Sequence, residues 1–376
     1  MFDKVKHVYS TVAIIFLNLV ILFLVVEAGS ALIIYAYWYR VVYEPSKNLS
    51  YYQQQEWSAD YWREGALLGF TYQPYVSWKN SAHHGDLINV DESGLRVTPN
   101  SEEDNPSLSI FCFGGSTMWG LGSPDWGTIP AYLAEIINAQ SKEESVKVVN
   151  FGQGSYISSQ EVIRLIQEIK HGNIPDIVIF YDGINDVGYA HGYGQAGVPF
   201  DMWRTFGVRT EVTKYQRFKN LALDLHISRG VRKGLGMLFG FQPFRGIGID
   251  KLSRETVSIY LHNMDIVDAL SKKYGFDYYF FWQPSLYEES KPLTLEEQEI
   301  KGRLVPASGS ERIEFRHAVY SLIKSEAEKR DKLYYIADIF NDTQDLMYFD
   351  GAHLIPDGNR IIAQRIADII AGSIAH

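Results

Sequence analysis

A serine follows two glycines at the end of an apolar run, and this turn could carry out chemistry. Residues 108–113 are mostly apolar, and Gly114-Gly115-Ser116 comes directly after them. An apolar run that stops at glycines predicts a buried strand and a tight turn into a helix. Ser116 would then stand at the strand's carboxyl end. Its hydroxyl could attack an electrophile if a base took its proton and donors stabilised the resulting oxyanion.

A candidate base lies near the other end of the sequence. His353 follows Asp350 by three residues, close enough for the carboxylate to orient the imidazole ring. Two further polar turns, at residues 150–155 and 182–186, each follow an apolar, strand-like run. The chain therefore contains a nucleophile, a base, an orienting acid and two turns that could supply oxyanion donors.

These four stretches, in this order, resemble the SGNH (GDSL-type) hydrolase family, which is named for its serine, glycine, asparagine and histidine. In that family the serine attacks an ester and the histidine is the base. The resemblance implies that Ser116 is the nucleophile, His353 the base and Asp350 the orienting acid. It also implies an oxyanion hole formed by the N–H groups of Ser116 and Gly154 and the side chain of Asn185.

The sequence departs from the family's pattern in two places. Gly114-Gly115-Ser116 stands where Gly-Asp-Ser is common, which leaves the nucleophile in place. The family's second glycine often falls five residues after the asparagine, where this chain has Ser155, with Gly154 one residue earlier. Because the donor is a backbone N–H, either residue could serve. The matching stretches cover residues 106–189 and 275–375.

Other functions for these residues are also possible. Glycine-rich turns bind phosphate, but neither nucleotide-binding glycine motif follows the strand here. The G-x-S-x-G turn of α/β-hydrolases is absent, because Met118 stands where its second glycine would be. Taken alone, Asp350 and His353 fit a helix cap and a surface histidine. Asp186, beside Asn185, is predicted to cap or hold a segment. The ordered set of four stretches favours catalysis.

Alternating strands and helices are predicted from residue 106 onward. Strands are expected at residues 108–113, 146–150, 177–181, 276–282 and 333–336, and helices at 129–137, 162–169, 257–270 and 361–370. Near-continuous apolar strands separated by helices predict an α/β fold with a parallel sheet covered by helices on both faces. The resemblance to the SGNH family implies that this is a three-layer, flavodoxin-like sandwich. Ligands bind such sheets at the carboxyl ends of the strands, where the candidate site residues fall.

Residues 1–40 are predicted to be a membrane anchor, because residues 11–39 are almost wholly apolar. Lys4 and Lys6 precede this segment and favour a single-pass protein whose remaining chain is extracytoplasmic. The alternative is a cleavable signal peptide with Ala28-Gly29-Ser30 as its small-residue site. Glu27, inside the span, indicates either a partner helix or a position near the membrane interface.

Three further regions follow this anchor. Residues 41–105 form an aromatic-rich lead-in, in which the adjacent His83 and His84 are expected to be loop or surface residues. Residues 106–376 are expected to be the SGNH-like catalytic domain, with an insertion at 190–252. Its basic run, 204–245, could lie on a membrane surface, bind an anionic polymer or pack as a solvated insertion. A long connection, 283–310, could shape a substrate pocket.

The resulting hypothesis is a serine esterase that cleaves acyl esters, with acetyl as the expected acyl group, of a cell-surface carbohydrate or lipid. The alternatives are an O-acyltransferase to a glycan hydroxyl and a non-catalytic glycan-binding or assembly protein. The formal net charge of −10 argues against a nucleic-acid partner. No metal or organic cofactor is required. Cys112, the single cysteine, is expected to be a buried core residue.

Overall fold

The computed structural model describes residues 2–101, 106–140, 145–200, 248–288 and 290–374. The larger of its two compact units comprises Pro45–Met202 and Pro243–His376, and the chain up to Glu44 belongs to the other. The basic run 204–245 that the sequence singled out lies outside the described residues.

Helix α1 (Phe2–Asn48) contains the segment predicted as a membrane anchor. Its stretch Lys4–Ile33 spans 30 residues and contains an 18-residue window with a mean hydropathy of 2.6. At about 1.5 Å per residue, this length is sufficient to cross a hydrocarbon core of ~30 Å. In the described part of the chain, one helix is thus long and apolar enough to span a membrane, a property that anchors and signal sequences share.

Within the described residues of the larger unit, five parallel strands form a sheet in the order β6-β5-β7-β8-β9. The strands are β5 (Leu108–Gly114), β6 (Val146–Asn150), β7 (Ile177–Asp182), β8 (Asp277–Trp282) and β9 (Leu333–Tyr335). Counted along the chain, this order is 2-1-3-4-5, as in flavodoxin-like folds. The predicted α/β fold is confirmed.

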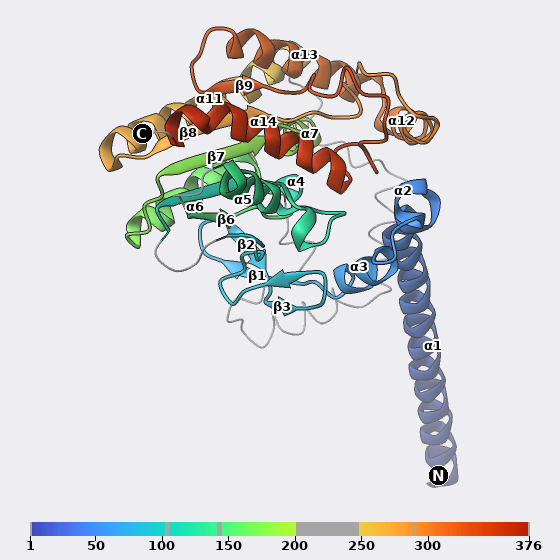
Figure 1. The fold of residues 1–376 in the computed structure, drawn as a ribbon. Helices are drawn as coiled ribbons and strands as arrows, with labels where there is room; N and C mark the ends of the chain where they lie inside the picture. Colours follow the sequence, from blue (N-terminus) through green and yellow to red (C-terminus); the bar gives the residue numbers. More distant parts are fainter. Residues whose placement is uncertain (1, 102–105, 141–144, 201–247, 289, 375–376) are drawn as a thin grey trace. The chain divides into compact units, whose positions relative to one another are not determined.

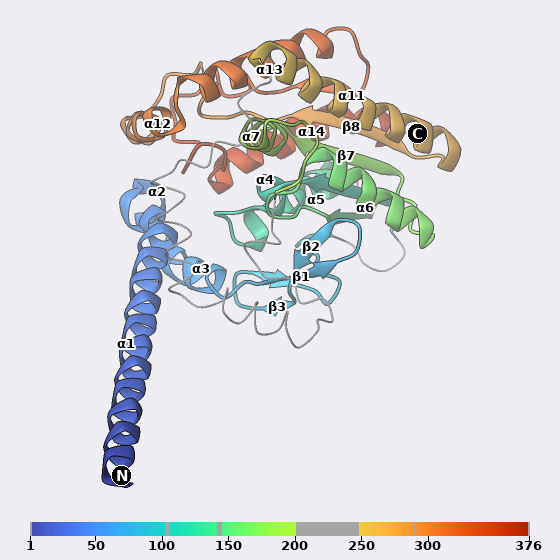
Figure 2. The ribbon, with the colours of Figure 1, turned by 180° about the vertical axis from the view of Figure 1, so that it is seen from behind.

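Helices cover both faces of this sheet, as the two opposite views show (Figures 1 and 2). One face carries α5 (Ile129–Gln140) and α14 (Pro356–Ile374), and the other carries α6 (Ser158–Lys170), α11 (Ile249–Tyr274) and α13 (Ser310–Ala327). The molecule therefore has the three layers that the sequence predicts. The observed helices are longer than the apolar repeats that predict them, because polar residues form their ends.

Aromatic side chains pack on one face of the sheet in register across neighbouring strands. Phe113 pairs with Phe180, and Phe180 pairs with Phe280. The ring centroids of the first pair are 5.2 Å apart and those of the second 4.3 Å, both stacked. Cys112 points to the opposite face and is fully buried, and burial raises the pKa of its thiol. This strand core fixes the carboxyl ends of β5 and β7.

The lead-in folds into short elements. They are α2 (Ser50–Gln53), α3 (Ser58–Gly65), an antiparallel pair formed by β1 (Phe70–Gln73) and β2 (Ser77–Asn80), and a second formed by β3 (His83–His84) and β4 (Asn89–Val90). The two adjacent histidines thus lie on a strand, where His84 is exposed and His83 is partly buried. Arg96 then forms backbone bridges to Val90 and to Asn150 at the end of β6.

Two connections differ in detail from the sequence prediction. The expected insertion at 190–252 begins within α7 (Ile184–Tyr193) and ends within α11. The connection 283–310, expected to be a long loop, contains α12 (Leu295–Ser308). This helix begins with a capping box in which Thr294 and Glu297 exchange side-chain and backbone hydrogen bonds. The apolar pattern of this segment is weak, so its capping residues were the sequence signal that could have predicted the helix.

Candidate active site

The turn after β5 carries Ser116 at the first position of the short helix α4 (Ser116–Trp119). Gly114 is required there because a Cβ would lie 2.8 Å from the Tyr181 carbonyl oxygen and 2.6 Å from the Met118 Cβ. A helix leaves its first N–H groups without intrahelical partners, so the Ser116 N–H is available at the turn. Local sterics therefore explain the first of the two glycines that precede this serine.

Ser116, His353 and Asp350 form one hydrogen-bonded chain. Ser116 Oγ lies 2.6 Å from His353 Nε2, and His353 Nδ1 lies 2.7 Å from Asp350 Oδ2. The carboxylate requires a proton on Nδ1, which leaves Nε2 able to accept the serine proton. The structure thus brings together the three residues that the sequence placed at opposite ends of the chain.

Asp350 is held by its own loop. Its Oδ1 accepts the backbone N–H groups of Ala352 and His353, each at 2.8 Å. Burial alone would raise the pKa of this carboxyl. The electrostatic interaction and hydrogen bonds with His353, together with the Ala352 N–H, instead hold the pKa below its ordinary value. Asp350 is therefore ionised at neutral pH and can orient the imidazole.

Aromatic residues of the lead-in stand behind the histidine. The His353 ring stacks on Phe349, with centroids 5.6 Å apart and planes at 22°. Phe349 in turn makes edge contacts with Tyr52 at 5.7 Å and Trp62 at 5.8 Å. Tyr52 also donates its hydroxyl proton to the Gly122 carbonyl at 2.8 Å. The lead-in therefore contacts the phenyl ring that stacks on the base, and it also contacts the loop beyond the nucleophile.

Asn185 lies in the first turn of α7, directly beside the nucleophile turn. Its Nδ2 donates to the Tyr156 carbonyl at 2.8 Å. A Cβ on Gly115 would overlap this same Nδ2, so the absence of a side chain at Gly115 permits the approach. An amide nitrogen carries two protons, so one remains for a second acceptor.

The loop after β6 contains the predicted donor Gly154. The Gly154 carbonyl accepts the Trp78 indole N–H at 3.0 Å, which fixes this peptide from the lead-in side. Ser155 has a φ of 68°, in the left-handed region that favours glycine. The position at which the family often has glycine is therefore the one with the glycine-like backbone.

Three polar or small residues contact this site without having been predicted from sequence. Gly152 packs so closely that a Cβ would overlap the Trp119 N–H. Asn150 Nδ2 lies 3.3 Å from the Met118 carbonyl oxygen. Gln283 Oε1 accepts the Thr117 hydroxyl at 2.9 Å. Gln283 directly follows β8, and a polar side chain after a buried strand was the one signal that could have indicated it.

Three carboxyl groups are buried beneath the Asn185 turn. Asp186 accepts the Ser158 hydroxyl at 2.6 Å and thereby holds the start of α6, a structural contact. Burial raises the pKa of Asp186 to about 6, although the Ser158 hydrogen bonds lower it. Burial and the charge of Asp182 raise the pKa of Glu161, and burial and the charge of Asp186 raise that of Asp182. Among the described residues, no group of three or more histidine, cysteine, aspartate or glutamate side chains is arranged so that it could hold a metal ion.

The fold and site define a doubly wound α/β protein with a serine, a histidine and an aspartate in one hydrogen-bonded chain. Ser116 follows β5 and Asn185 follows β7, which are strands 1 and 3 counted along the chain and are neighbours in the sheet. The order of the strands reverses between these two, and folds of this kind bind ligands at the carboxyl ends of the strands at this switch point. No protein-family model matches the sequence. No curated protein matches it either.

Solved structures similar to this chain include three esterase or lipolytic proteins. The acetyl xylan esterase AlAXEase is 14% identical to this chain, with a TM-score of 0.40, and the match covers 70% of this chain and 100% of the esterase. A catalytic mutant of an acetylxylan esterase from Geobacillus stearothermophilus is 13% identical, with a TM-score of 0.39, covering 72% and 96%. A lipolytic G-D-S-L family protein from Veillonella parvula is 11% identical, with a TM-score of 0.36, covering 70% and 99%.

Proposed function

We propose that this chain is a serine ester hydrolase of the SGNH type. The observation that carries the proposal is the pair of short contacts that join Ser116 Oγ to His353 Nε2 at 2.6 Å and His353 Nδ1 to Asp350 Oδ2 at 2.7 Å. This is the arrangement that a serine needs to become a nucleophile at neutral pH. A serine and histidine that were merely structural would not need an ionised acid behind the ring.

The reaction has two halves. His353 Nε2 takes the proton of Ser116 as its Oγ attacks the ester carbonyl, and the imidazolium then protonates the leaving alcohol. A water molecule attacks the acyl-serine, gives its proton to His353, and the acid leaves as Ser116 regains its proton. In each half Asp350 keeps Nδ1 protonated and stabilises the imidazolium.

The oxyanion is held by N–H donors around the nucleophile turn. The second amide proton of Asn185 and the backbone N–H of Ser116 are two donors. The third is a backbone N–H of the loop after β6, from Gly154 or from Ser155, whose left-handed backbone matches the family's glycine position. Donors placed before the reaction stabilise the developing charge without reorganisation.

We propose a carbohydrate or lipid acyl ester at the cell surface as the substrate. This rests on the membrane-spanning length of α1 and on the basic residues Lys4 and Lys6 that precede its apolar stretch. The helix would then be an uncleaved anchor and the larger unit extracytoplasmic. After alkaline carbonate washing of membranes, the full-length protein should stay in the pellet; release into the supernatant would indicate a cleaved signal sequence.

The catalytic proposal is tested with the full-length protein in detergent, p-nitrophenyl acetate as the ester, and Ser116→Ala as the matched variant. Release of p-nitrophenol that disappears in the variant supports a serine acyl enzyme. Equal rates in both proteins, with circular dichroism showing both folded, would contradict it. If an added sugar alcohol takes the acyl group faster than water does, the protein is an O-acyltransferase that uses the same site.

A further inference from the structure

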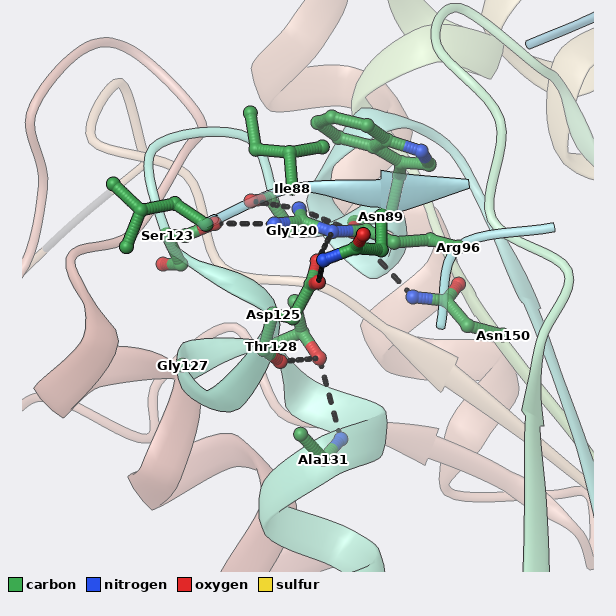
Figure 3. Close-up of polar contacts among 12 residues, drawn as sticks. Ile88, Asn89, Arg96, Gly120, Ser123, Asp125, Gly127, Thr128, Ala131 and Asn150 are labelled. Atoms are coloured by element: carbon green, nitrogen blue, oxygen red, sulfur yellow. Dashed lines mark hydrogen bonds and ion pairs between the residues drawn. The ribbon is translucent and has the colours of Figure 1, made fainter. Parts of the chain in front are cut away.

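The Arg96 side chain is buried beside the nucleophile helix, although it comes from the lead-in (Figure 3). Its Nε donates to Asp125 Oδ1 at 2.8 Å and its Nη2 to the Ser123 carbonyl at 2.7 Å. Its Nη1 donates to the carbonyls of Trp119 at 3.0 Å and Gly120 at 2.9 Å. All three guanidinium nitrogens are thus hydrogen-bonded, and three of the four acceptors belong to one backbone segment.

That segment is the end of the helix that Ser116 begins. The last carbonyls of a helix have no intrahelical partner, and a positive charge at this end is favourable. Gly120 has a φ of 94°, and its N–H and that of Leu121 both donate to the Ser116 carbonyl at 3.0 Å. The guanidinium therefore caps a helix of one turn whose first residue is the nucleophile.

Arg96 also connects this helix to the loop after β6. Its backbone forms a bridge with Asn150, whose Nδ2 lies 3.3 Å from the Met118 carbonyl and 3.4 Å from that of Trp119. The loop after β6, which carries the proposed oxyanion donors, begins one residue after Asn150. One residue of the lead-in thus sets the nucleophile helix against the strand end that carries the Gly154 and Ser155 N–H groups.

Asp125 keeps the guanidinium in this orientation. Its Oδ1 accepts Arg96 Nε, while its Oδ2 accepts the Asn89 amide at 3.0 Å. The Arg96 side chain is 0% exposed and that of Asp125 11%. A buried ion pair adds little net stability compared with apolar packing, because removing two charges from water is costly. Positional precision is a better reason for this arrangement than stability.

We propose that Arg96 is a positioning residue for the reaction, which rests on the function proposed above. It fixes the distance between Ser116 Oγ and the oxyanion donors by capping α4 and binding its end to the end of β6. A shift of about 1 Å in such geometry can cost on the order of 100-fold in rate. The lead-in would therefore be part of the catalytic unit.

The test compares Arg96→Met with the unaltered full-length protein in detergent. Two rates are measured, p-nitrophenyl acetate turnover and the labelling of Ser116 by a fluorophosphonate, followed by intact mass. We expect both kcat and the labelling rate to fall about 10- to 100-fold, with KM changed less than about twofold. Arg96→Lys keeps the charge but loses the planar fork, so its rates should lie between the two.

A stability control separates positioning from general weakening. Ile323→Ala removes a fully buried side chain from α13, distant in sequence from the nucleophile turn, and should lower the melting temperature without changing either rate. If Arg96→Met does not fold, the two rates and the melting temperature of Arg96→Lys are compared with those of Ile323→Ala instead. Unchanged rates in the folded Arg96 variant, with the unaltered protein labelled at Ser116, would overturn the role of Arg96 alone. Absence of Ser116 labelling in the unaltered protein would overturn the proposed function and this inference together.

Discussion

His353 Nδ1 and Asp350 Oδ2 lie 2.7 Å apart within one four-residue loop. The same loop is closed by the Phe349 N–H, which donates to the His353 carbonyl at 3.1 Å. The base and its orienting acid therefore depend on one local turn, whereas the nucleophile arrives from a strand 237 residues earlier. A change in this loop should alter the chemistry without disturbing the sheet.

Asp350→Asn should lower kcat by roughly 1,000- to 10,000-fold, because the amide cannot hold His353 in the required tautomer. The backbone bonds to Oδ1 can persist, so the fold should remain. The measurement is ester turnover across a pH series, with Asp345→Asn as the control, since Asp345 is an exposed residue of the preceding loop. A rate that matched the control would exclude Asp350 as the orienting acid.

Asn185→Ala should lower kcat by roughly 10- to 1,000-fold through loss of one oxyanion donor. KM should change little, because the missing bond forms in the transition state. Circular dichroism and thermal unfolding would verify that α7 is intact. An unchanged kcat in a folded variant would remove Asn185 from the oxyanion hole.

Gly115→Ala should reduce kcat although it adds only one methyl group. The new Cβ overlaps Asn185 Nδ2, so the amide must leave the Tyr156 carbonyl. The expected loss is on the order of that for Asn185→Ala and should not add to it in the double variant. Gly192→Ala is the matched control, because a Cβ at Gly192 meets no atom within 4 Å. Full additivity would show that Gly115 acts by another route.

Asp186 predicts a pH dependence of stability. Its folded pKa is about 6, above an ordinary value of about 3.9, so the unfolded state binds fewer protons between these values. The free energy of unfolding should therefore fall as pH rises from about 4 to 6, by on the order of 2–3 kcal/mol from this group.

Urea unfolding of the unaltered protein and Asp186→Asn, followed from pH 4 to 6.5, isolates that contribution. The amide oxygen can still accept the Ser158 hydroxyl, so α6 keeps its start. The variant should gain stability relative to the unaltered protein as pH rises. A constant difference between the two would show that Asp186 does not titrate in this range.

The fold could be predicted because its central strands are buried on both faces. Such strands read as continuous apolar runs, as in β7, where all six residues are buried. The bounds predicted for the edge strand β6, 146–150, also match the structure. Helix ends were less predictable. The apolar repeat of α6 begins at Val162, yet the helix begins at Ser158, where Asp186 from another element accepts its bonds. The sequence alone does not show that distant partner.

Whether a site residue could be predicted also depends on whether its partners are near to it in the sequence. Ser116 and His353 stand in short turns whose own chemistry is visible in sequence. Arg96 and Gln283 act through side chains far along the chain, as in the bond between Thr117 and Gln283, 166 residues apart. No local spacing encodes such a contact. The position of Gln283 directly after a buried strand indicates a polar site residue, but its partner and the role of Arg96 required the structure.

Cys112 gives the central strand its own chemical reporter. The thiol is 0% exposed, burial raises its pKa, and it is the single cysteine of the chain. The thiolate is the nucleophile that attacks thiol reagents, so Cys112 can react only when the packing around β5 opens. The rate of its modification therefore measures how often the strand that carries Ser116 opens, without any introduced probe.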